Sequence, residues 1–402
     1  METNIFKNRT FLLLFLTSIF AVTGFSMFLT TTTWYVIRVL DMPSMLGWVL
    51  IAITVPRLVM MTYGGVLADN YKKTVIMFGT NLSQAVILAV MTILIFTDQL
   101  NIVWLLILGG LFGMLDAFFG PASTSMIPKI FKKGSFQKAN AYFQSVDQVS
   151  FILGPVLAGV IMEFGSVSTS YLVGAILIAI SAVLVFPPFI KEGPVENEVK
   201  QTPMQNLVEG FKYVRSSNFL MIGILILITL NFFIFGTLHI AMPLLVDLFG
   251  GTPINLSYME VSLSIGMIIG TMILGNYVVN KKGRTTLYGL LATTVFFLIF
   301  SVVGNLGMLT FVLLFIGLSM SFVFIPFFTA AQEVTDNRMT GRVMSLIFLA
   351  MNGFDPIAYA VVSGLTGAGI AVQTVLTGFG IIGLIVGLVI LFKAKNFQKI
   401  VT

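Results

Sequence analysis

The sequence predicts an all-α membrane protein with twelve transmembrane helices, arranged as two pseudo-symmetric six-helix bundles. Two observations lead to this prediction. First, 57% of the 402 residues are hydrophobic and only 9% are charged, and the mean hydropathy is +1.01, whereas about 25% of residues are charged in soluble domains. Second, the apolar residues form long runs separated by short polar segments. Most of the chain therefore requires a bilayer around it.

Twelve apolar runs approach or exceed the roughly 20 residues that a helix needs to cross a hydrocarbon core of about 30 Å. In the first half we expect helices at 10–36, 44–68, 74–97, 102–124, 140–164 and 168–190. In the second half we expect them at 219–245, 256–279, 285–303, 308–331, 342–365 and 370–392. The predicted domains are a bundle at 1–190, a linker at 191–218 and a second bundle at 219–402.

The linker is the only long polar segment of the sequence. Within it, Leu207, Phe211 and Val214 recur at helical spacing, and charged residues lie between them. This pattern predicts a short amphipathic helix that lies on the inner membrane surface. A solvated linker without such a helix is the alternative.

The distribution of basic residues predicts the orientation, because cytoplasmic loops near helix ends are enriched in Lys and Arg. Of the 22 basic residues, all except Arg38 and Arg57 fall at the termini or in alternate loops that share one side. We therefore expect both termini to be cytoplasmic in a multi-pass protein of the cell membrane.

Several classes of protein are excluded by what the sequence lacks. It contains no cysteine, which rules out disulfides, thiol catalysis and zinc-thiolate sites. It has no Gly-x-x-x-x-Gly-Lys-Ser/Thr motif and hence no ATPase of that kind. The basic residues are dispersed among loops, so we expect no nucleic-acid partner. We predict no enzyme activity, no metal site and no cofactor.

One loop motif occurs once in each half of the sequence. Residues 64–73 read Gly-Gly-Val-Leu-Ala-Asp-Asn-Tyr-Lys-Lys, and a second copy includes Gly275, Asn280, Lys281, Gly283 and Arg284. The first copy resembles the loop between helices 2 and 3 of the major facilitator superfamily. Asn70 stands where that family usually has arginine, Lys72 stands where it usually has glycine, and the second copy lacks the acid. The resemblance implies a loop that controls the change of conformation, with these residues as candidates: Gly65, Asp69, Lys72, Lys73, Gly283 and Arg284.

A second resemblance concerns the types of substrate. Asp116 to Ala122 leads to the sequence Gly-Pro-Val-Leu-Ala-Gly at 154–159, and Pro326, Gly341-Arg342 and Asp355-Pro356 echo this order. The run resembles the macrolide-efflux type of drug:proton antiporters. It implies multidrug efflux, as in antibiotic resistance, by alternating access around a central cavity. The expected partners are small amphipathic molecules, protons and the lipid bilayer, and the protein is expected to be a monomer. Export of a siderophore or native metabolite is one alternative, and a membrane sensor or lipid-handling scaffold is another.

Four ionisable residues within the predicted spans are candidates for the coupling chemistry: Arg57, Asp116, Asp147 and Asp355. Charges inside a membrane are costly and are retained where they face a partner or water. Burial disfavours the charged form of a carboxylic acid, so the three aspartates are the candidates for proton coupling. Arg57 keeps its charge and suits a counter-ion or a substrate contact.

Each of these residues also has a structural interpretation. An Arg57–Asp116 ion pair within the first half could serve folding alone. Asp147 could belong to a gate, and Asp355 could cap a helix broken before Pro356. Asn231, Gln144 and Gln148 are further candidates for the cavity lining. The 22 Met and 38 Phe residues are mainly packing or lipid-facing, although surfaces of this kind also adapt to varied apolar ligands.

Overall fold

The structure is a computed structural model that describes residues 7–130, 136–190, 192, 203–277, 279–336 and 339–398. In these ranges the chain is helical and contains no β-strand. Twelve segments of the described chain are long and apolar enough to cross a membrane. The predicted all-α, twelve-span fold class is confirmed.

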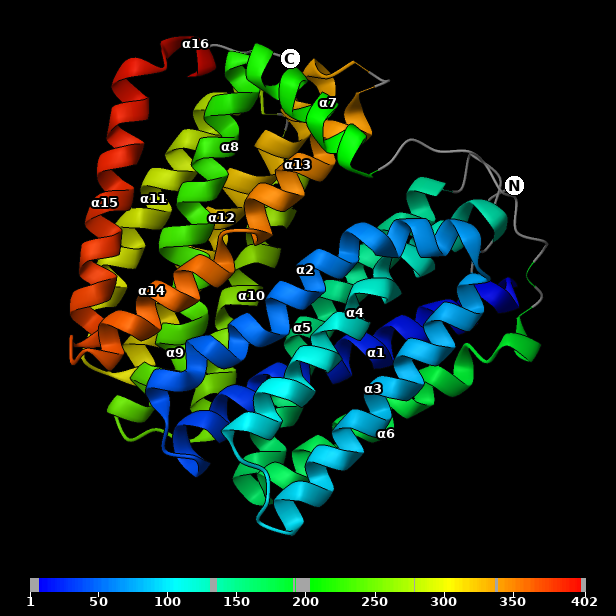
Figure 1. The fold of residues 1–402 in the computed structure, drawn as a ribbon. Helices are drawn as coiled ribbons and strands as arrows, with labels where there is room; N and C mark the ends of the chain where they lie inside the picture. Colours follow the sequence, from blue (N-terminus) through cyan, green and yellow to red (C-terminus); the bar gives the residue numbers. More distant parts are fainter. Residues whose placement is uncertain are drawn as a thin grey trace. The chain divides into compact units, whose positions relative to one another are not determined.

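The first six spans form the sequence of elements α1 to α6 (Figure 1). Their bounds are α1 Arg9–Trp34, which continues as the π-helix η2 Tyr35–Val39, then α2 Leu46–Asn70, α3 Lys73–Phe96, α4 Ile102–Ile130, α5 Phe136–Phe164 and α6 Val167–Leu184. Two short 3₁₀ turns, η3 Pro43–Met45 and η5 Pro187–Phe189, precede α2 and follow α6.

The second six spans contain more interruptions. Their bounds are α8 Asn218–Leu230, the π-helix η6 Asn231–Phe235, α9 Gly236–Leu248, α10 Pro253–Asn276, α11 Lys282–Val302, α12 Leu306–Val334, α13 Thr340–Asn352, α14 Asp355–Gly367 and α15 Val372–Lys393. The amphipathic helix α7 Pro203–Ser216 precedes them, and the short α16 Lys395–Gln398 follows.

The structure corrects the sequence interpretation at two places. The motif 64–73 was interpreted as a loop although the second span was predicted to reach residue 68, and in the structure α2 continues to Asn70, so that only Tyr71 and Lys72 separate it from α3. A helix keeps its backbone groups paired near the membrane, which outweighs the tendency of Gly64-Gly65 to break it. The span expected at 342–365 is two helices, because the chain breaks between α13 and α14 just before Asp355-Pro356.

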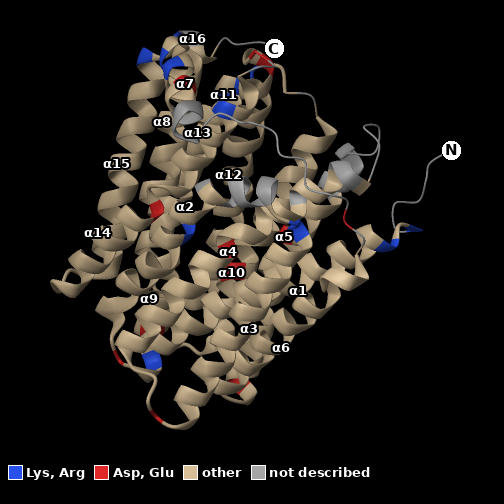
Figure 2. Ribbon diagram, turned by 45° about the vertical axis from the view of Figure 1, so that its right-hand side comes forward, with Lys and Arg blue, Asp and Glu red and all other residues tan. Residues whose placement is uncertain are grey.

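The chain folds as two compact units. Unit 1 comprises Met1–Met42, Trp48–Lys200 and Thr252–Ser257, and unit 2 comprises Pro43–Gly47, Gln201–Gly251 and Tyr258–Thr402. Each unit therefore takes one short segment from the other half of the sequence. Figure 2 shows that the helices carry few charges and that basic segments gather near α16 and α11.

Polar side chains join the helices of unit 1. Between α1 and α6, Thr31 Oγ1 lies 2.6 Å from Ser170 Oγ, and Thr32 Oγ1 lies 2.9 Å from Tyr171 Oη. Between α3 and α6, Asn81 Nδ2 donates to Ser181 Oγ at 2.6 Å. Hydrogen bonds of this kind stabilise helix association in lipid, where the hydrophobic effect does not act between helices.

Unit 2 uses small residues for the same purpose. A Cβ added at Gly266 of α10 would lie 2.0 Å from the Leu314 carbonyl oxygen, and one added at Gly317 of α12 would lie 2.0 Å from that of Leu263. The backbones of α10 and α12 therefore touch where no larger residue fits. Ser262 Oγ also donates to the Thr310 carbonyl oxygen at 2.6 Å across the same pair of helices.

Candidate functional site

Three helices of unit 1 bring an ion pair and an aromatic ring together within the membrane-spanning part of the chain. Arg57 Nε of α2 lies 2.8 Å from Asp116 Oδ2 of α4. The guanidinium of Arg57 also lies over the ring of Phe25 of α1, with Cζ 4.8 Å from the ring centroid. The Asp116 side chain is only 17% exposed, whereas that of Arg57 is 39% exposed. The ion pair considered from the sequence is thus formed.

The backbone around the ion pair explains how α2 and α4 approach so closely. A Cβ added at Gly113, one turn before Asp116, would lie 2.1 Å from the Ile53 carbonyl oxygen of α2. Gln84 of α3 donates its amide to the Phe112 carbonyl oxygen at 3.2 Å. Close packing at Gly113 therefore sets the distance that the Arg57 side chain spans.

A second acid of unit 1 lies near this pair. Asp147 of α5 is within electrostatic range of both Asp116 and Arg57. Its side chain and that of the neighbouring Gln148 are exposed. The side chain of Gln144 lies outside the described part of the chain. Unit 1 thus contains one arginine and two carboxylic acids in mutual range, and the two acids can compete for the charge of Arg57.

Unit 2 holds the third acid, Asp355, at the first position of α14. The side chain is buried, and Oδ1 has no hydrogen-bond partner in the described part of the chain. A Cβ added at Gly236 would lie 3.2 Å from this oxygen, so Asp355 packs against the start of α9. It makes no side-chain cap, although a carboxylate at a helix N-terminus is favoured by the helix dipole.

Asn231 and His239 lie on the helices that pack near Asp355. Asn231, considered for the cavity lining, is buried and donates Nδ2 to the Leu227 carbonyl oxygen at 2.8 Å. It therefore binds its own helix at the start of the π-helix η6. The ring of His239 meets those of Phe235 and Tyr359 edge-on, with centroids 4.9 Å and 6.2 Å apart. These contacts give His239 a packing role.

The side chains of the first loop motif are described only from Tyr71 onward. Those of residues 66–70, which include Asp69, lie outside the described part, and Gly65 has no side chain. Lys72 is exposed and Lys73 is buried. The carboxylate of Glu192 receives hydrogen bonds from the backbone N–H groups of Lys73 and Thr74 at 3.0 and 3.1 Å, and it lies 3.8 Å from Lys73 Nζ. Glu192 thus caps α3 directly after the motif.

The second motif has a comparable arrangement in unit 2. Lys282, at the start of α11, pairs with Glu333 near the end of α12. Arg284 Nε donates to Tyr288 Oη at 3.0 Å, and its Cζ lies 5.0 Å from the centroid of that ring. A Cβ added at Gly283 would lie 2.0 Å from the Phe397 carbonyl oxygen, so this glycine allows α16 to pack on α11.

The profile of the Major Facilitator Superfamily matches residues 14–354. The chain belongs to this superfamily. Members transport solutes, so this protein is a membrane transporter and not an enzyme. This membership agrees with the resemblance of the loop motif at 64–73 to the superfamily. Among the described residues, no cluster of His, Asp or Glu could hold a metal ion.

The relatives of this chain include proteins named as efflux proteins, MFS-type transporters or exporters. Macrolide efflux protein A of Streptococcus pyogenes is 28% identical over 59% of this chain, which spans 57% of that protein. The uncharacterized MFS-type transporter YvqJ of Bacillus subtilis is 25% identical over 98% of this chain and 94% of its own length. The putative bacilysin exporter BacE of Bacillus subtilis is 21% identical over 74% of this chain and 75% of its own.

Solved structures show the same fold. The nucleoside transporter NupG aligns with a TM-score of 0.74 at 14% identity and covers 96% of this chain and 99% of its own. An auto-inhibited peptide transporter of the POT family aligns with a TM-score of 0.75 at 11% identity, with 98% of each chain covered. At these identities the likeness concerns architecture and carries no information on the substrate.

Sequence reasoning missed Glu192, Glu333 and Lys282 as partners in the superfamily's loop regions. Glu192 lies in the polar segment treated as linker, and Glu333 lies at the polar end of a span. Neither position stands out among solvated charges. The available signal was only that each acid directly follows an apolar run on the side where the loop bases lie.

We expect Glu192→Gln to lower the free energy of unfolding by about 1 kcal/mol, or roughly 3 °C in melting temperature. Glutamine keeps the shape of the side chain but loses its charge and one of the two oxygens that receive the Lys73 and Thr74 N–H groups. Thermal unfolding of the detergent-purified protein measures the effect. Glu163→Gln, which changes an exposed acid of the same unit, is the control, and an equal shift in both variants would refute the capping role.

Proposed function

We propose that this superfamily member is a proton-coupled exporter of small amphipathic compounds, such as macrolide-like drugs, in the cell membrane. The observation that supports it best is the Arg57–Asp116 ion pair inside a span, with Asp147 in electrostatic range. In this proposal the protein works as a monomer by alternating access.

The ion pair can couple proton movement to conformation because only one of its members changes charge. Arg57 remains protonated under all physiological conditions. When Asp116 takes up a proton, Arg57 loses its counter-ion and can turn toward Asp147 or toward an anionic or aromatic part of a substrate. Protonation of Asp116 would then favour one access state over the other, by the difference between the proton's binding free energies in the two states.

The exposed polar face of unit 1 supports a water-filled pathway. Asp147 and Gln148 are exposed within the span Ser145–Phe164. Carboxylates in membrane helices face water or a partner and not lipid. We therefore assign this face, with the partly exposed Arg57, to the transport pathway. In unit 2 we propose Asp355 as a further candidate for proton binding, because it is buried.

The substrate class is proposed from the relatives. Macrolide efflux protein A is named for efflux of macrolides. Export of a native metabolite is the second candidate, because the putative bacilysin exporter BacE is also a relative.

Orientation and the control loop complete the proposal. The basic loops are assigned to the cytoplasmic side, and both termini with them. The amphipathic helix α7 is assigned to the same membrane surface. The two loop motifs are proposed to control the balance between the two access states. The residues proposed for this role are Gly65, Asp69, Lys72, Lys73, Gly283 and Arg284.

Proton flux into proteoliposomes tests the function. We expect addition of a substrate macrolide to change the fluorescence of an enclosed pH dye within seconds, and empty liposomes to show no change. A set of hydrophilic dipeptides and siderophores, added in the same assay, distinguishes a metabolite exporter. Binding without proton flux for every compound would refute the proposed proton coupling.

A further inference from the structure

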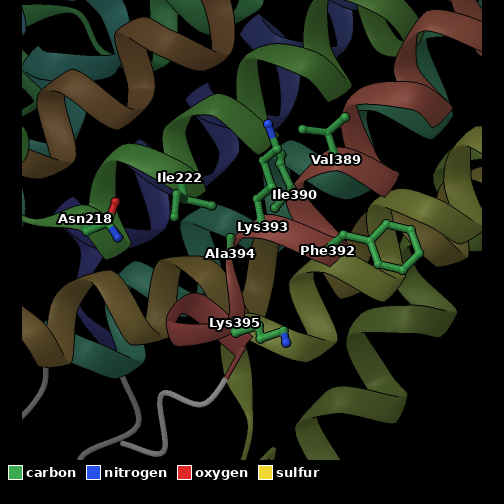
Figure 3. A pocket seen from close by; sticks show the side chains of 8 residues that line it. All are labelled: Asn218, Ile222, Val389, Ile390, Phe392, Lys393, Ala394 and Lys395. Carbon is green, nitrogen blue, oxygen red and sulfur yellow. The ribbon is translucent and has the colours of Figure 1, made fainter.

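A cavity of about 490 Å³ opens between α8 and α15 of unit 2. Asn218 begins the apolar span Asn218–Leu248, and Lys393 ends the apolar span Val372–Lys393. The cavity therefore lies where both spans reach the boundary between the hydrocarbon core and the headgroups. Figure 3 shows the side chains that line it.

The polar side of the cavity is cationic. Lys393 and Lys395 line it and are exposed, and none of its described lining residues is acidic. Asn218 adds an exposed side-chain amide, and Figure 3 shows this side chain at the opposite side of the cavity from Lys393 and Lys395. Because α8 begins at Asn218, its N-terminus contributes further partial positive charge.

Apolar side chains line the cavity as well, and two of them face outward. The apolar lining residues include Ile222, Val389 and Phe392, and the exposed fractions of Val389 and Phe392 are 47% and 72%. In a membrane-embedded chain, side chains exposed to this extent at the end of a span contact acyl chains. The cavity thus combines two ammonium groups with a surface suited to hydrocarbon.

Helix stabilisation explains only part of this arrangement. Lys393 lies in the last turn of α15, where a cation is favoured by the helix dipole. Lys395 lies beyond the end of α15 at the first residue of α16, where a helix dipole gives a cation no advantage. The helix dipole therefore accounts for Lys393 but not for Lys395.

We propose that this cavity binds one anionic phospholipid. Its phosphate lies in the part of the cavity lined by Lys393 and Lys395, and its acyl chains follow the apolar lining residues Ile222, Val389 and Phe392. Ammonium groups donate hydrogen bonds to phosphate oxygens, and basic residues at a membrane surface favour anionic lipids. The apolar lining distinguishes a lipid from a soluble phosphate. The inference depends on insertion in a membrane and does not depend on the proposed substrate or coupling.

Native mass spectrometry of the full-length protein in detergent tests this site. We expect phosphatidylglycerol to bind about tenfold more tightly than phosphatidylcholine, and Lys393→Gln with Lys395→Gln to remove that preference. The variant Lys393→Arg with Lys395→Arg keeps both charges and should keep the preference. Its retention shows that loss in the glutamine variant does not result from misfolding.

The control variant is Lys7→Gln with Arg9→Gln, which removes two exposed bases of unit 1 that do not line the cavity. It should bind phosphatidylglycerol as the parent does. An unchanged lipid preference in the Lys393/Lys395 glutamine variant, or an equal loss in the control, would overturn the proposal. Binding of free glycerol 3-phosphate as tightly as phosphatidylglycerol would likewise overturn it in favour of a soluble ligand.

Discussion

The double variant Arg57→Met with Asp116→Leu should unfold at a higher temperature than either single variant. Removing one member of a buried ion pair leaves the other charge without compensation, which costs roughly 3–5 kcal/mol in fully buried cases. Arg57 is 39% exposed, so water reduces this cost, and we expect about 2 kcal/mol for each single variant. That corresponds to a drop of roughly 4–8 °C in melting temperature.

The double variant leaves no orphaned charge, and the contact of residue 57 with Phe25 becomes an ordinary apolar one. We therefore expect it to recover more than half of the loss. Thermal unfolding of the three purified variants, followed by intrinsic fluorescence, gives the comparison. Gln148→Leu, which removes an exposed polar side chain of the same unit, is the control and should shift the melting temperature by about 1 °C at most. Strictly additive losses would show that the pair is uncoupled.

The ion pair was accessible from the sequence because charges within the spans are so few. Arg57 and Asp116 are embedded in apolar runs of the first half, and a charge in lipid requires a partner. The same scarcity identified Asp147 and Asp355. The spans themselves were predictable because the apolar runs match the thickness of a bilayer, and this requirement holds for every span independently of its neighbours.

Features that depend on contacts between distant segments could not be predicted in this way. Glu192 caps α3 across 119 positions of sequence, and no local pattern identifies which acid meets which helix end. The π-helix η6 and the break before α14 depend on how α9 and α14 pack within unit 2. Only Pro356 signalled that break, since a proline has no N–H with which to continue a helix from the preceding turn but is tolerated in the first turn of a new helix.

Local rules also misjudged the loop motif at the end of α2. Gly64-Gly65 would disrupt a helix in water, and the polar residues that follow made a loop the natural interpretation. At a membrane boundary the backbone N–H and C=O groups have fewer alternative partners, so α2 continues to Asn70. The position of the Asp69 side chain is not part of the described structure, and the roles of Gly65 and Asp69 remain predictions.

The largest functional effect is expected for Asp116→Asn. Protons can be carried only by groups whose charge changes between the two access states, and Arg57 is excluded because it stays charged. Of the acids within the described spans, Asp116 alone contacts Arg57 directly. Asparagine preserves its size and can still receive the Arg57 N–H, but it cannot release a proton. Efflux driven by a pH gradient should therefore fall by roughly 100-fold or more, since it requires that release in each cycle.

Substrate binding should survive in the same variant, because asparagine imitates the protonated acid. We expect its affinity to stay within about threefold of the parent and to be constant between about pH 6 and 8, while the parent's affinity varies with pH. Asp98→Asn is the matched control, because Asp98 is an exposed loop acid with φ of 53°, a conformation that asparagine also adopts readily. If Asp116→Asn still transports against a gradient in proteoliposomes, the proton is carried elsewhere. Asp147, which shares the field of Arg57, is then tested next, followed by Asp355, whose unpartnered Oδ1 gives it an independent reason to bind a proton within unit 2.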